Sequence, residues 1–209
     1  MFLKRLSFSF AFLLALGLAP GAARAGLVVD TGTPSNAIGA GYAFNSAHSY
    51  AGQFSVLGGL TINSIQGYFS TDAGNVTISL FSNSEDGDGG FVPGAMLRTA
   101  TFATGAGALA WTGASALNWA VGQGTYWAVF ASTYGAGSQA SMPGLASSPL
   151  ADYAIMQGGQ WFDASDLGLA QGLRVDASAA SATVPEPASM ALIGLGLIGM
   201  GALRRRRQG

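Results

Sequence analysis

The chain has 209 residues, of which 49% are hydrophobic and 9% are charged, and its formal net charge is −1. It has no cysteine and one histidine, His48, which excludes a catalytic cysteine–histidine pair and a zinc site built from cysteines or several histidines. Residues 26–183 hold nine acidic and two basic residues, a net charge of −7. Because phosphate recognition needs clustered Lys and Arg, this balance argues against nucleic acid as a partner.

The N-terminal residues 1–25 have the composition of a secretory signal peptide. Its parts are a basic pair, an apolar run and two small residues before the cut: Lys4 and Arg5, residues 6–19, Ala23 and Ala25. The apolar run covers only ~21 Å of a ~30 Å hydrocarbon layer, which favours a cleaved peptide over a membrane anchor. We expect signal peptidase to cut after Ala25, so that the mature chain begins at Gly26.

Residues 26–177 predict one all-β domain. Glycine supplies 25 of the 158 residues between the two ends, about twice its usual share, and short apolar runs alternate with turn signals. Residues 75–80 alternate strictly, residues 125–131 are apolar on both faces like a central strand, and a change of phase at Asn63–Ser64 predicts a bulge or a bend. The predicted strands are 40–44, 53–57, 60–69, 75–80, 97–103, 109–112, 125–131, 153–157 and 173–176. About nine short strands indicate a β-sandwich of jelly-roll type.

The densest acidic stretch carries Glu85, Asp86 and Asp88 among glycines. Alternating carboxylates and glycines can surround a hard cation, so calcium binding is one interpretation. The stretch lacks the spacing and the terminal Glu of an EF-hand, and a strand connection made of residues that tolerate unusual φ is the favoured interpretation. No cofactor is therefore expected, and these three residues are the weak candidates for a metal.

The four tryptophans, Trp111, Trp119, Trp127 and Trp161, are the candidate carbohydrate-binding residues. Exposed together on one face of a sandwich, their indole rings could stack on sugars. The alternative is that they belong to the core, and Trp127 in particular lies in the middle of the strand that is apolar on both faces.

Catalytic residues are not expected. Asp163 and Asp166 follow Trp161 and could form the carboxylate pair of a glycoside hydrolase, but their spacing does not distinguish such a pair from two turn residues. A Ser-His-Asp triad would have to use His48, whose neighbours form no recognisable motif. A solvated loop histidine is the expectation.

A small, polar segment at 178–183 predicts a flexible linker to the C-terminal region. Pro185 and Pro187, which follow it, lack a backbone N–H and push their preceding residues out of the helical region. They predict an extended, rigid stub that displays Glu186 between them.

The stub leads into residues 188–203, an uncharged run that contains four glycines. As a helix this run would span about 24 Å, which is short for a permanent transmembrane anchor. Four arginines follow it directly, and the positive-inside bias holds them on the cytoplasmic side as a membrane stop. They are Arg204, Arg205, Arg206 and Arg207. The orientation predicts that the domain is exported.

Together, Val184 to Pro187, the short Gly-rich helix and the Arg cluster resemble a PEP-CTERM sorting signal over residues 184–209. In that family an exosortase, a membrane cysteine transpeptidase of Gram-negative bacteria that make exopolysaccharide, recognises the signal. The resemblance implies that this protein is a substrate of the enzyme, processed near Pro185 to Pro187. An ordinary anchor with an accidental Pro-Glu-Pro is the alternative.

Three segments, Ser79–Ser82, Pro93–Leu97 and Gly124–Trp127, are similar to parts of the choice-of-anchor domains that accompany PEP-CTERM tails. This looser resemblance implies a compact β-sandwich without catalytic activity. The resulting hypothesis is an exported surface or matrix protein, structural or adhesive, in an exopolysaccharide or biofilm setting. A carbohydrate- or calcium-binding module and, further off, a glycoside hydrolase are the alternatives.

Overall fold

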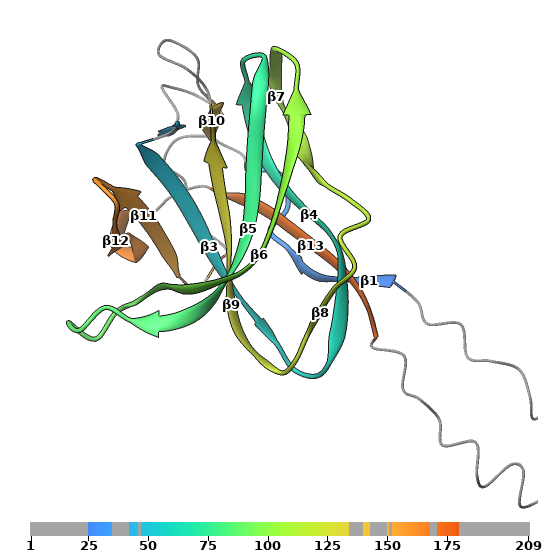
Figure 1. Cartoon of the computed structure of the whole chain (residues 1–209), viewed down its shortest axis with the longest axis vertical. Helices are drawn as coiled ribbons and strands as arrows, with labels where there is room; N and C mark the ends of the chain where they lie inside the picture. The colour runs from blue at the N-terminus through green and yellow to red at the C-terminus, as the bar shows by residue number, and fades with distance from the viewer. Residues whose placement is uncertain are drawn as a thin grey trace, which may run out of the picture.

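The structure is a computed structural model that describes residues 25–34, 42–45, 47–133, 140–142, 150, 152–167 and 171–179. These residues form thirteen β-strands and one 3-10 turn, η1 (Ser165–Leu167), and the strands make two antiparallel sheets (Figure 1). The prediction of an all-β sandwich is confirmed. No helix in this part of the chain is long and apolar enough to cross a membrane, and the helix predicted at 188–203 lies outside it.

One sheet has seven strands and is built on β4 (Leu60–Thr71). Its path runs through β1 (Ala25–Asp30), β13 (Gly172–Ala179), β4, β10 (Ala140–Met142) and β2 (Tyr42–Phe44), and β7 (Gly107–Ala114) and β8 (Trp119–Val121) also pair with β4. The other sheet has six strands in the order β12 (Gln160–Asp163), β11 (Tyr153–Gln157), β3 (His48–Val56), β9 (Gly124–Ser132), β5 (Gly74–Glu85) and β6 (Phe91–Thr104).

The main core fills the space between the sheets. Ile62 and Ile65 of β4 face Ile78 of β5 and Phe130 of β9, and all four side chains are fully buried. Phe69 joins them with its ring 5.9 Å from that of Phe130 in an edge-on arrangement, a favourable geometry for aromatic pairs. The core therefore forms from the inward faces of both sheets, as the strand alternation predicts.

The predicted bulge at Asn63–Ser64 is confirmed. Asp176 of β13 pairs with Ser64 and the next residue, Ala177, pairs with Ile62, so Asn63 is the extra residue. The bulge reverses the alternation of β4 at this point. Ile62 and Ile65, which have an odd spacing, can therefore both face the core.

Four strands were not predicted, namely β1, β8, β10 and β12. Each has only three to six residues and pairs with a longer neighbour, so tertiary pairing rather than local pattern makes it a strand. In addition, β13 continues through Ser178 and Ala179, beyond the domain end predicted at 177, because these residues pair with Thr61 and Leu60. The expected linker therefore loses its first two residues to the sheet.

The six-stranded sheet is strongly bent. β12 and β6 stand at its opposite edges, and in a flat sheet five strand spacings would separate them by about 24 Å. Instead, their Cα atoms approach within 8 Å. Register shifts next to Leu80 and Phe81 interrupt the pairing of β5 with β6 and bend the end of this hairpin toward β11 and β12 (Figure 1).

Candidate functional site

The outer face of the six-stranded sheet, the face turned away from the main core, carries a second apolar cluster. Because side chains alternate along β9, Trp127 and Val129 point to this face while Ala128 and Phe130 point to the main core. The prediction that 125–131 is a central strand buried on both faces is confirmed. The cluster consists of Ala51, Val92, Trp127, Val129 and Ala154, with Phe81 and Trp161 packed against it.

The bend of the sheet covers this cluster. Phe81 on β5 and Trp161 on β12 meet edge to face, with ring centroids 6.1 Å apart and planes at 72°. The small residues Ala51 and Ala154 lie on the strands between them and leave room for the two rings. Trp127 is consequently 0% exposed although no second sheet of the described residues packs on this face. It belongs to a core, which is one of the two interpretations drawn from the sequence.

A line of polar side chains follows the buried indole. Nε1 of Trp127 donates a hydrogen bond to Oδ1 of Asn83 at 2.7 Å, and Nε2 of Gln53 donates to the same oxygen at 3.1 Å. Gln53 also hydrogen-bonds the carboxylate of Asp152. The amide groups thus connect the aromatic cluster to the acidic end of the face.

At that end, the carboxylates of Asp86 and Asp163 converge beside Gly90. The Oδ2 atom of each lies 2.6 Å from the point where a Cβ on Gly90 would stand. Oδ1 of Asp86 accepts hydrogen bonds from the N–H groups of Asp88 and Gly90, and Oδ1 of Asp163 accepts from the N–H and hydroxyl of Ser165. One oxygen of each carboxylate is therefore held by its own turn while the other faces the shared point.

Asp152 extends this acidic group. Burial raises the pKa of its carboxyl and the negative charge of Asp163 raises it further, while the hydrogen bond from Gln53 acts in the opposite direction. The ion pair found in the described residues joins Arg174 and Asp30 on the other sheet, so these carboxylates have no basic partner there.

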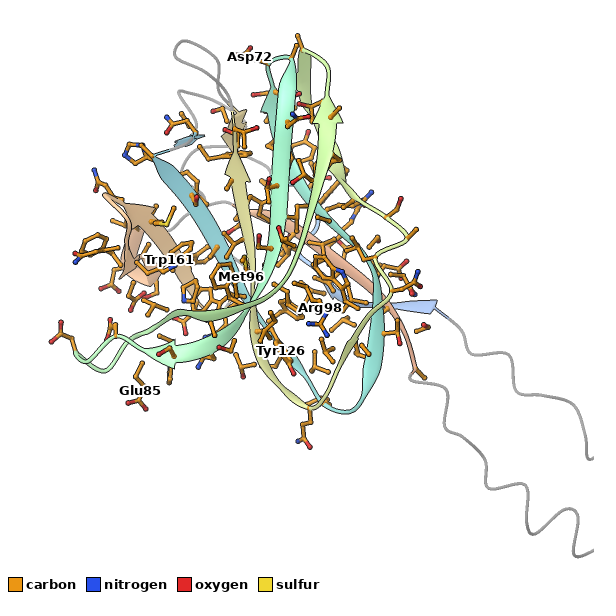
Figure 2. All side chains as sticks on the ribbon, viewed as in Figure 1. Asp72, Glu85, Met96, Arg98, Tyr126 and Trp161 are labelled. Carbon is orange, nitrogen blue, oxygen red and sulfur yellow. The ribbon has the colours of Figure 1, made fainter. Side chains whose placement is uncertain are left out.

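The three weak calcium candidates lie at the connection between β5 and β6 and do not surround one point. Asp86 meets Asp163 across Gly90, Asp88 takes part through its backbone N–H, and Glu85 ends β5 as an exposed residue that points away from the domain (Figure 2). In the described ranges, no three acidic or histidine side chains are grouped so that they could hold a metal ion.

Trp111 lies on the outer face of the other sheet, where it holds the N-terminal segment. Its Nε1 donates to Oγ1 of Thr33 at 3.3 Å, the guanidinium of Arg174 lies 3.9 Å from its ring centroid, and Tyr68 packs beside it at 5.5 Å. Arg174 also pairs with Asp30 at 3.0 Å. The backbone N–H of Gly32 and then Arg174 lower the pKa of Asp30.

The four tryptophans therefore do not share one exposed face. Trp119 is 8% exposed in the main core, Trp127 is buried in the second cluster, and Trp111 and Trp161 lie half-buried on opposite outer faces. A stacking surface made of all four is excluded by this arrangement. Trp161 is the one that stands beside the amide and carboxylate groups.

Comparison with known families concerns the C-terminal end. A family model described as the PEP-CTERM protein-sorting motif matches residues 183–207. The chain carries a PEP-CTERM sorting signal. The matched range includes the stub, the apolar run and the basic cluster, that is Pro185, Glu186, Pro187, residues 188–203, Arg204, Arg205, Arg206 and Arg207. No curated protein and no solved structure matches the chain.

The PEP-CTERM signal marks the protein as exported and exosortase-sorted, with a C-terminal membrane anchor before cleavage. The matched range includes the arginines predicted to be the membrane stop. These arginines and the Pro-Glu-Pro stub lie outside the part of the chain that the structure describes. The arginines concerned are Arg204, Arg205, Arg206 and Arg207.

The two ends of the domain lie next to each other. Of the residues predicted for signal-peptide cleavage, Ala23 lies outside the described residues, whereas Ala25 is the first residue of β1. Ala25 pairs with Ser178 of β13. The ends that lead to the predicted signal peptide and to the sorting signal therefore leave the domain side by side.

Asp163 and Asp166, the pair considered for a glycoside hydrolase, do not stand alone as a pair in the structure. Asp166 lies in η1, whose first residue, Ser165, donates a hydrogen bond to Asp163. The carboxylates near that of Asp163 are those of Asp86 and Asp152. His48 begins β3 and pairs with Gln157, so it is a strand residue rather than a loop residue.

Gln53, Asn83 and Asp152 were not recognised from the sequence as site residues. The one available signal was Gln53, an amide at a position of β3 between the buried residues Ala51 and Phe54. Asn83 and Asp152 gave none, because their roles depend on which strands become neighbours.

Proposed function

We propose that the protein is a non-catalytic component of the cell surface or of the extracellular polysaccharide matrix of a Gram-negative bacterium, with a structural or adhesive role. The observation that carries the proposal is the PEP-CTERM motif at residues 183–207 behind a β-sandwich. The first described strand begins at Ala25 and the last ends at Ala179, four residues before the matched motif.

The position of the sandwich relative to the sorting signal supports this role. Ala179 ends β13, and Pro185 follows six residues later. Six extended residues reach at most about 20–22 Å. The exosortase would act within this distance of a folded domain. Any group that it attaches would be joined to the domain through β13, which is paired with β1 on one side and β4 on the other.

The intact mass of the mature protein from cells with and without the exosortase tests the proposal. We expect a species that begins at Gly26 and lacks Arg204 to Arg207 only when the enzyme is present, together with recovery from the surface or matrix fraction. Retention of the four arginines in both strains would show that the tail is a plain anchor. Recovery only from the periplasm would contradict the surface role.

Carbohydrate binding is a second candidate. The observation in its favour is the outer face of the six-stranded sheet, where the half-buried ring of Trp161 stands near amide and carboxylate groups. This is the combination of a ring for stacking and polar groups for orientation that small-ligand sites use. Surface recovery alone does not test this candidate, which requires a binding measurement.

A further inference from the structure

The outer face of the six-stranded sheet offers solvent a small apolar area. Met96 pairs directly with Phe81 across β5 and β6, so both side chains stand on this face, and Met96 is 59% exposed. Trp161, on β12, packs its ring against Phe81 and is half-buried. Phe162, one residue further along β12, points to the opposite side because strand side chains alternate.

The same face has hydrogen-bonding capacity that the protein does not use. Oδ1 of Asn83 accepts two hydrogen bonds, from Trp127 and from Gln53, which fixes the orientation of the amide. Its Nδ2 group has no partner among the described residues and is not buried. A ligand on this face could therefore accept hydrogen bonds from an amide whose orientation is already fixed.

The charge of the face is one-sided. Asp152, Asp163 and Asp86 follow one another along its edge, and in the described part of the chain no basic side chain pairs with them. Burial raises the pKa of Asp152 and the neighbouring carboxylate of Asp163 raises it further, while the hydrogen bond from Gln53 acts in the opposite direction. A cationic group on a ligand would relieve this repulsion.

The apolar area is too small for a protein partner of ordinary size. Stable protein interfaces bury about 1,200–2,000 Å² with several apolar anchors. This face shows one exposed thioether, that of Met96, two partly covered rings, and the partly covered side chain of Met156, which pairs with Trp161. The combination of a ring and an amide suits a sugar, because a sugar presents a flat C–H face to an indole and hydroxyls to an amide.

We propose that the outer face of the six-stranded sheet binds a polysaccharide that carries free amino groups, such as a polymer of glucosamine. The ring of Trp161 stacks on a sugar face, the Asn83 amide contacts hydroxyls, and Asp152, Asp163 and Asp86 pair with ammonium groups. This inference rests on the proposed role in a polysaccharide matrix and names the class of polymer.

Binding of the mature protein to a glucosamine hexamer and to the matching N-acetylglucosamine hexamer tests the proposal, at a pH where the amines are protonated. The two ligands differ in charge but share the sugar ring. We expect Trp161 fluorescence to change with the glucosamine oligomer, affinity to fall with added salt, and the acetylated oligomer to bind at least about fivefold more weakly.

Variants locate the site. Asp152→Asn/Asp163→Asn keeps the size of both side chains and should weaken glucosamine binding at least about fivefold. Asp176→Asn, on the other sheet, is the matched charge control, and Phe162→Ala is the control for Trp161→Ala. Both controls should bind like the natural protein.

Three results would overturn the inference. They are equal binding of both oligomers, an equal loss in Asp176→Asn, and binding of polylysine that depends on Asp152 and Asp163 as strongly as glucosamine binding does. The last result would make the face a site for basic peptides. None of them affects the sorting test, since the mass and location of the mature protein do not depend on Asp152 or Asp163.

Discussion

Replacing Asn83 by alanine should destabilise the second apolar cluster, because Asn83 provides the acceptor for a buried indole. Trp127 is 0% exposed, and its Nε1 lies 2.7 Å from Oδ1 of Asn83. Without that oxygen the buried N–H loses its partner, which costs about 1–3 kcal/mol, and Gln53 loses an acceptor as well. For a domain of this size, a loss of roughly 2 kcal/mol corresponds to a decrease in Tm of about 4–8 °C.

A double-mutant cycle with Trp127→Phe separates this effect from lost packing. The Trp127→Phe background has no N–H to satisfy, so Asn83→Ala should cost about 1–2 kcal/mol less there than in the natural protein. Urea denaturation of the four mature proteins, followed by circular dichroism, gives the four free energies of unfolding. Effects that add to within about 0.5 kcal/mol would refute the reasoning, because uncoupled residues behave in that way.

Three further predictions concern stability and sorting. Asp152→Asn should raise Tm at neutral pH, because the folded-state pKa of Asp152 lies above its ordinary value of 3.8 and its ionisation therefore costs stability as pH rises. The gain in Tm should vanish below about pH 4, where the carboxyl is protonated in the folded and the unfolded protein. A gain that stays constant with pH would contradict this. Gly113→Ala should lower the free energy of unfolding by about 1–3 kcal/mol in a denaturation experiment, because a Cβ there collides with the carbonyl oxygen of Ile65. Gly105→Ala is the control, since a Cβ at Gly105 meets no atom within 4 Å. Replacing Pro185 to Pro187 by alanine should leave the C-terminal arginines on the protein in the presence of the exosortase, as mass spectrometry would show; loss of the arginines would mean that the stub is not read.

Strands with a clear period were predictable. Residues 75–80 lie inside β5 as predicted, because alternation of apolar and polar residues is a local property. Residues 153–157, a short apolar run, form β11 with the predicted bounds. The bulge at Asn63 was predictable for the same reason, since it appears in the sequence as a change of phase. Short strands such as β8 and β10 were not, because three residues carry no period.

The candidate site was predictable only in part. Trp161 and Asp163 were recognised by residue type, but Asp163 was paired with its sequence neighbour Asp166 rather than with Asp86 and Asp152. Trp127 was correctly suspected of being a core residue, yet its core lies outside the sandwich. Neither outcome follows from spacing, because both depend on the bend of the β5–β6 hairpin.

The all-β class and the PEP-CTERM sorting signal can be recognised from the sequence alone, because both depend on residue types in a fixed local order. The signal peptide, which has the same local character, stays a prediction. Which carboxylates meet, and which tryptophan remains near solvent, depends instead on how the strands pack together. Asp86 and Asp163 lie far apart in the chain and converge because shifts of strand register carry one edge of the sheet to the other, and such shifts are set by packing of the whole domain.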